Sequence, residues 1–149
     1  MSNPVKEFAP DLTQAFPRSP RETLAGYVVA ARTLDKCRAV VAGTEGEYHY
    51  DCPLDSTFFD FTGIDSGEFK AKVESGATDE EMEDWIREHS KIKDDSERIQ
   101  WNNKMRYTRP CDMKPELQEF LEDYIPKYVG SDRPVYVWFD VYDIEEKRL

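Results

Sequence analysis

The sequence has few of the side chains from which catalytic and metal centres are usually built. It contains 3 cysteines and 2 histidines among 149 residues. Because Cys37, Cys52 and Cys111 are odd in number and widely spaced, we expect reduced, buried thiols rather than a disulfide framework. The patterns of a Walker loop, G-x-G-x-x-G, G-x-S-x-G and H-E-x-x-H are all missing. We therefore expect neither a cofactor nor a bound metal.

Long apolar runs and an excess of basic charge are missing as well. No stretch approaches the roughly 18 consecutive apolar residues of a membrane-spanning helix. The opening MSNPVKEFAPDL lacks the apolar run of a signal peptide. The formal net charge of -11 repels phosphate backbones. The sequence thus predicts a cytoplasmic protein that binds neither membranes nor nucleic acid.

The chain does have enough aromatic residues for a packed core, with 8 phenylalanines, 8 tyrosines and 3 tryptophans. A length of 149 residues suits one domain. We predict an all-α fold, in which a single domain of six to seven short helices covers residues 18–149. Residues 1–17, where prolines interrupt any period, are predicted to form an extended arm.

The first helix is predicted to begin at Ser19. Ser19 can cap it, Pro20 suits the first helical position, and Glu22 completes a capping box. Apolar residues then recur at helical spacing until Gly43 ends the pattern. Gly26 would lie inside this helix.

Further helix starts carry a polar cap or a proline in the first turn, and we expect them near Asp55, Asp65, Thr78, Ser96 and Pro115. Residues 135–144, VYVWFDVYDI, are rich in β-branched and aromatic side chains, which favours a strand. They also fit one face of a helix. We favour the helix because the sequence offers no obvious partner strand for this backbone.

Cationic side chains gather early in the chain. Residues 18–38 hold five basic side chains and two acidic ones, in a protein that is acidic overall. We predict that Arg18, Arg32, Lys36 and Arg38 bind a phosphate, a carboxylate or an acidic partner. The alternative, which 31 acidic residues make the simpler one, is that these cations pair with acidic helices such as residues 79–84.

The loop at residues 48–55 is polar and aromatic without an apolar period. We predict that Tyr48, His49 and Asp51 share a binding face with the basic cluster. His49, Asp51 and Cys52 are also metal-ligand types, but a site needs three or four ligands at characteristic spacing, and that spacing is missing. A Cys–His nucleophilic pair could come from the same residues, again without a recognisable motif.

Several motifs of the chain resemble a known family. RSPRETLAGY, LDKCRA, GEYHYDCPLD and FFDFTG, with a looser echo in WFDVYD, are similar to the bacterial domain-of-unknown-function family 5069. The resemblance covers most of the chain. It implies no activity and supplies no catalytic residues.

Two classes of function follow from these patterns. The first is a non-enzymatic binding or interaction module that uses the first helix and the 48–55 loop, with an unknown protein or a small anionic ligand as its partner. The second is an enzyme or small-molecule binder with an anion-holding pocket. In that case Arg32 and Arg38 would clamp the anion while Tyr48, His49 or Asp51 transfers protons. The sequence alone leaves open whether the protein is an enzyme.

Overall fold

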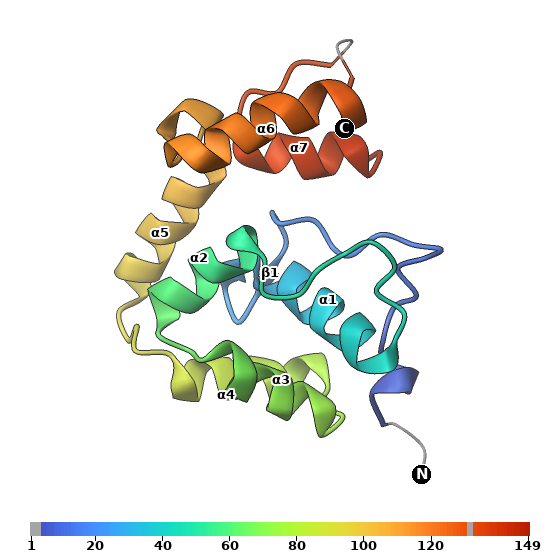
Figure 1. Cartoon of the computed structure of the whole chain (residues 1–149). Coiled ribbons are helices and arrows are strands. Elements are labelled where there is room, and N and C mark those ends of the chain that lie inside the picture. The colour runs from blue at the N-terminus through green and yellow to red at the C-terminus, as the bar shows by residue number, and fades with distance from the viewer. Residues whose placement is uncertain (1–3, 131–132) are drawn as a thin grey trace. The chain divides into compact units, whose positions relative to one another are not determined.

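The computed structural model describes residues 4–130 and 133–149, which are mostly helical (Figure 1). The chain forms two compact units, Met1–Arg98 and Ile99–Leu149. Seven α-helices lie in the described residues, which confirms the all-α class and the expected number of helices. None of the described helices is both long enough and apolar enough to cross a bilayer.

The elements of the first unit are the 3-10 turn η1 (Pro4–Glu7), the strands β1 (Thr23–Leu24) and β2 (Tyr27–Val28), and the helices α1 (Ala30–Ala42), α2 (Pro53–Thr62), α3 (Ser66–Glu74) and α4 (Asp79–His89). Helix α5 (Asp95–Tyr107) begins in the first unit and ends in the second. The second unit continues with the 3-10 turn η2 (Pro110–Asp112) and the helices α6 (Pro115–Tyr128) and α7 (Trp138–Glu145).

The predicted helix start at Ser19 is wrong, because the chain folds back on itself in this region. Strands β1 and β2 pair antiparallel, with Thr23 opposite Val28. Between the strands, Ala25 and Gly26 have φ angles of 53° and 81°, left-handed values that an α-helix does not contain. Gly26 adopts this conformation without steric cost, so it forms part of the hairpin turn rather than interrupting a helix.

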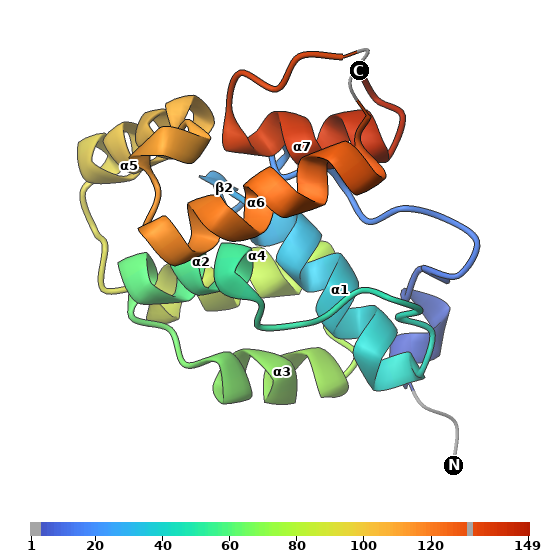
Figure 2. The same cartoon turned by 45° about the horizontal axis from the view of Figure 1, so that its top comes forward.

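Helix α1 begins at Ala30 and ends as predicted at Gly43. Residues 30–39 are all buried, including four that carry a charged side chain. The hairpin, η1, α2 and α3 all pack against α1 (Figure 1, Figure 2). A helix covered on all sides takes its charged side chains into the interior, where each needs a partner.

The segment before the hairpin is anchored by two apolar side chains. Val5 and Leu12 are 1% and 6% exposed, whereas Phe8 and Phe16 are 41% and 49% exposed. The Leu12 N–H donates to the Thr44 carbonyl oxygen at 2.8 Å. This contact holds the early chain near the end of α1.

An aromatic cluster joins the hairpin to α2, α3 and α4. The Phe58 ring lies 5.5 Å from Tyr27 in an edge-on arrangement, and Phe69 lies 5.4 Å from Phe59 and 5.9 Å from Trp85. Such edge-to-face contacts add to the stabilisation that burial itself provides. The aromatic residues therefore form a core, as their number suggested.

Two predicted helix caps are present as expected. The Asp65 carboxylate accepts the Glu68 N–H at 3.0 Å at the start of α3. At the start of α4, the Thr78 hydroxyl accepts the Glu81 N–H at 3.2 Å, and Glu81 accepts the Thr78 N–H at 3.2 Å. Helix α2 differs, because Asp55 lies inside its first turn rather than ahead of it.

In the second unit, α6 and α7 lie side by side (Figure 1, Figure 2). The Tyr124 hydroxyl of α6 donates to the Glu145 carboxylate of α7 at 2.6 Å. Leu121 and Phe139 are buried. The ambiguous segment 135–144 is thus helical from Trp138 onward, which confirms the helix rather than the strand.

We expect Gly26→Ala to lower the free energy of unfolding more than Gly43→Ala. Both glycines have similar φ angles, 81° and 77°, at which an alanine costs about 1 kcal/mol. A Cβ added at Gly43 meets open space, whereas at Gly26 it meets the Arg98 guanidinium, which donates to the Gly26 carbonyl oxygen at 3.0 Å. Urea unfolding of the two variants measures the difference, and equal losses would contradict a role for the Arg98 contact.

Candidate functional site

Two of the predicted binding cations, Arg18 and Arg38, are bonded to carboxylates inside the first unit. Arg18 donates to Asp35 through Nε and Nη2, both at 3.0 Å, and to Asp79 through Nη1 at 3.0 Å. Arg38 donates to the other oxygen of Asp79 at 2.7 Å and to the Ala77 carbonyl oxygen at 2.9 Å. Because Asp35 and Arg38 belong to α1 and Asp79 opens α4, this network ties the two helices together.

The network changes the ionisation of its members. Burial alone would lower the pKa of Arg18, but the bonds and charges of Asp35 and Asp79 raise it above its ordinary value. Burial would likewise raise the pKa of Asp79, but the Arg38 and Arg18 guanidinium groups lower it below its ordinary value. Arg18 and Arg38 thus have the partner that the alternative interpretation expected, an acid of residues 79–84.

Lys36 and Asp55 form a second pair, which is more deeply buried. The Lys36 Nζ lies 2.9 Å from Asp55 Oδ2, with side chains that are 4% and 0% exposed. The same ammonium lies 3.1 Å from the Cys52 Sγ. Asp55 also accepts the Thr33 hydroxyl at 2.6 Å and the Asp51 N–H at 3.0 Å. Asp55 therefore joins α1 to the 48–55 loop, a role that the sequence did not indicate.

The structure brings the predicted site residue Arg32 into contact with two others, Tyr48 and Arg18. The Arg32 guanidinium carbon stands 5.6 Å from the centroid of the Tyr48 ring, within cation–π range. Its Nη1 donates to the Arg18 carbonyl oxygen at 3.3 Å. Since Arg32 is 2% exposed, this guanidinium lies inside the unit rather than on a face of α1.

His49 and Asp51 are the predicted site residues that remain exposed. The Asp51 carboxylate accepts the Ser66 hydroxyl at 3.0 Å, and its backbone has a φ of 64°. In residues 4–130 and 133–149, His49 makes no hydrogen bond and no ion pair. The seven predicted residues therefore do not converge on one cleft: two are accessible, whereas Arg32, Lys36 and Arg38 are buried.

The three cysteines form no disulfide, as expected, but they differ in burial. Cys37 is buried, and burial raises the pKa of its thiol to about 12, so the thiol stays protonated at neutral pH. Cys111 is exposed, which corrects the expectation that all three are buried. In the part of the chain that the structure describes, no group of three His, Cys, Asp or Glu side chains could hold a metal ion.

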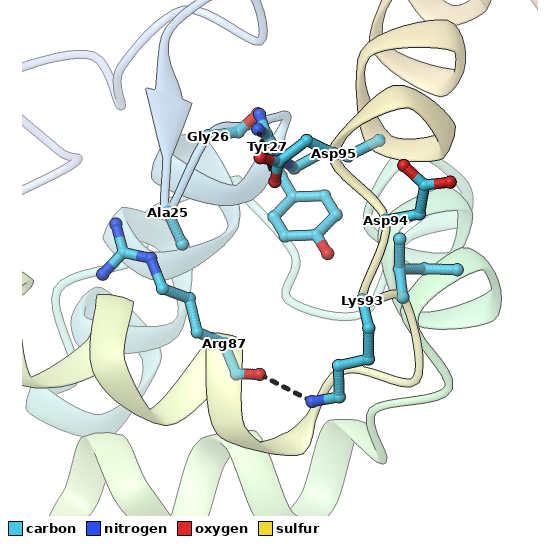
Figure 3. Close-up of a pocket in the computed structure, with 9 residues that line it drawn as sticks. Ala25, Gly26, Tyr27, Arg87, Lys93, Asp94 and Asp95 are labelled. Carbon is cyan, nitrogen blue, oxygen red and sulfur yellow. Dashed lines mark hydrogen bonds and ion pairs between the residues drawn. The ribbon is translucent and has the colours of Figure 1, made fainter.

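A cavity of about 360 Å³ lies in the first unit, beside the hairpin turn and the segment that joins α4 to α5 (Figure 3). Its lining residues come from three separate parts of the unit; they are Ala25, Gly26, Tyr27, Arg87, Ile92, Lys93, Asp94, Asp95 and Arg98. Figure 3 shows the Tyr27 side chain at the wall of the cavity; this side chain is buried, and its hydroxyl lies 3.0 Å from the Ser90 hydroxyl. None of these residues was predicted as a site residue, because the charged stretch around Lys93 reads as an ordinary exposed segment.

The cations of the cavity differ in how their charge is balanced. The Lys93 ammonium donates to the carbonyl oxygens of Arg87 and Glu88 at 3.0 and 3.4 Å. Within the described residues, no carboxylate lies at ion-pair distance from Lys93. Arg98 donates to the Gly26 carbonyl oxygen at 3.0 Å and to Asp95 at 3.3 Å. Among the residues that the structure describes, Lys93 is therefore a cation of the cavity without a carboxylate partner.

A family model described as "Domain of unknown function (DUF5069)" matches residues 14–148. The match covers nearly the whole chain and confirms the resemblance that the sequence motifs indicated. A comparison with curated proteins gives no match.

We expect Asp55→Ala to lower the free energy of unfolding by about 3 to 5 kcal/mol, because it leaves the Lys36 ammonium buried without its carboxylate. The double variant Lys36→Met/Asp55→Leu removes both charges together and should recover a large part of this loss. Urea unfolding followed by circular dichroism measures both variants. A double variant no more stable than Asp55→Ala would contradict the charge-pair explanation.

We expect Asp79→Asn to reduce the loss of stability in acid. The folded protein holds the pKa of Asp79 below its ordinary value of 3.8, so this carboxylate stabilises the fold above about pH 4. The contribution disappears as the pH falls through the lower pKa of the folded state. Urea unfolding between pH 7 and roughly pH 3 should therefore show a shallower decline for Asp79→Asn than for the unmodified chain.

The matched control for this measurement is Asp84→Asn on the same helix. Asp84 has an 84% exposed side chain, and its ion pair with Arg87 is long at 3.4 Å. This variant should follow the unmodified chain across the pH range. The network explanation fails when Asp79→Asn and Asp84→Asn behave alike.

Proposed function

We propose that this chain, which belongs to the DUF5069 family, is a non-enzymatic binding module for a small molecule that carries an anionic group. The ligand occupies the cavity beside the hairpin turn (Figure 3). The observation that carries this proposal is the Lys93 ammonium, whose partners are carbonyl oxygens rather than carboxylates. A positive charge of this kind keeps its attraction for an incoming anion.

The size and lining of the cavity suit a small ligand. Its volume of about 360 Å³ falls at the lower end of the range of ligand pockets, roughly 300 to 1,000 Å³. Ile92 offers apolar surface, while Arg87 adds a second cation. The ion pairs of Arg87 are 3.6 and 3.4 Å long and exposed, so they compete weakly with a ligand.

The cavity is a better candidate for the ligand site than a face of α1, because the cations of the basic cluster are already paired. Arg18, Lys36 and Arg38 already bond to carboxylates inside the unit. An anion that bound there would have to displace Asp35, Asp55 or Asp79 and would lose the contacts that hold the helices. An anion that binds Lys93 in the cavity displaces no carboxylate.

Binding rather than catalysis fits the carboxylates at the rim. Asp94 accepts the Ser96 N–H at 2.8 Å and the Ser96 hydroxyl at 2.9 Å. These bonds lower the pKa of Asp94 below its ordinary value, and the bond from the Ser96 backbone has the larger effect. A carboxylate with a lowered pKa is a weak general base at neutral pH.

A protein-docking surface at the 48–55 loop is the second candidate for a binding role. His49 and Asp51 are exposed there, on a loop whose backbone is held by Asp55.

We also propose a cytoplasmic setting for either role, because three cysteines without a disulfide suit a reducing compartment.

We expect Lys93→Ala to abolish ligand binding that Lys91→Ala preserves. Lys91 has the same side chain and is exposed, but it does not line the cavity. A thermal-shift panel of inorganic phosphate, mono- and dicarboxylates and nucleoside monophosphates supplies the test. A ligand at 100 times its dissociation constant adds about 2.7 kcal/mol, a shift that is easily measured. A flat response over the panel, or equal binding by the two variants, would overturn the proposal.

A further inference from the structure

Helix α6 presents aromatic rings to solvent along one side. Phe120, Tyr124 and Tyr128, here named the aromatic stripe, recur every four residues and so share a helix face. Phe120 and Tyr128 are 60% and 59% exposed, although the same helix buries Leu121 to 4%. Large exposed rings in a row are a feature of surfaces that bind other molecules.

The rings of the aromatic stripe are ordered by contacts among themselves. The centroids of Phe120 and Tyr124 lie 5.6 Å apart, and those of Tyr124 and Tyr128 lie 4.5 Å apart. The Tyr124 hydroxyl donates to Glu145 of α7 at 2.6 Å, which fixes the middle ring. A partner that binds pre-ordered rings loses less conformational entropy than one that must order them.

The charge around the aromatic stripe is negative. Helix α6 carries one basic side chain, Lys127, against four acidic ones, Glu116, Glu119, Glu122 and Asp123. Lys127 pairs with Asp123 at 3.0 Å, so the cation of the helix is already neutralised. Glu116 precedes Phe120 by one helical turn and therefore lies next to its ring.

We propose that the aromatic stripe is a docking surface for an arginine-rich segment of a partner protein. A guanidinium stacks on an aromatic face and attracts carboxylates at the same time, so exposed rings beside acids match arginine in both respects. The same acids repel an acidic partner and a phosphate backbone. The docking surface uses no residue of the cavity, and the two proposals stand separately.

The test is the binding of a short fluorescein-labelled peptide of alternating arginine and glycine, followed by fluorescence anisotropy on the full chain. Phe120→Ala/Tyr128→Ala should weaken binding about tenfold, the loss expected when two ring–guanidinium contacts are removed. Because both side chains are mostly exposed, the variant should fold, which its circular dichroism spectrum checks. A peptide in which citrulline replaces arginine, with the same shape and no charge, should not bind.

Two controls separate the aromatic stripe from general attraction to an acidic protein. Phe16→Ala removes another exposed ring, 49% exposed on the first unit, and should leave binding unchanged. Glu116→Gln/Glu119→Gln on α6 should weaken binding more than Glu80→Gln/Asp84→Gln on α4, which removes the same charge elsewhere. Equal losses within either comparison would overturn the proposal. Binding of the citrulline peptide would overturn it too, as would sedimentation runs in which a second copy of the chain covers the face.

Discussion

The pairing of buried charge along α1 is the interaction on which the first unit depends. An isolated charge in a protein interior costs several kcal/mol, so α1 can be buried on every side only where acids from other elements meet its cations. Asp79 does this from the start of α4, and Asp55 does it from the first turn of α2. Apolar packing supplies the driving force, while these pairs select which helix ends lie against α1.

The type of partner separates the structural cations from the candidate functional ones. Arg38 and Lys36 bond to carboxylates and are nearly inaccessible. Lys93 is held by the carbonyl oxygens at the end of α4 and borders a cavity. The partner of a cation is therefore more informative than its presence in a basic cluster, since carbonyl oxygens orient an ammonium without cancelling its charge.

Local signals in the sequence predicted the parts of the fold that depend on neighbouring residues. Gly43, Asp65 and Thr78 mark helix ends as expected, because caps are satisfied within one turn. The capping pattern at Ser19 failed to predict a helix because the hairpin forms from the same residues. The Glu83 carboxylate of α4 stabilises this hairpin by accepting the Ala25 N–H at 2.8 Å. The cavity could not be predicted, since its lining comes from segments that meet only in the folded chain and share no motif.

The Asp55 carboxylate holds the 48–55 loop by accepting main-chain N–H groups, from Asp51 at 3.0 Å and from Cys52 at 3.4 Å. Every residue type except proline can supply such an N–H. Relatives of this chain can therefore differ in the side chain at position 49 and keep the path of the loop, whereas position 51, with its φ of 64°, favours Asp, Asn or Gly. A deletion between Tyr48 and Asp55 would move those N–H groups out of register, so the length of the loop is constrained as well as the residue type at position 51.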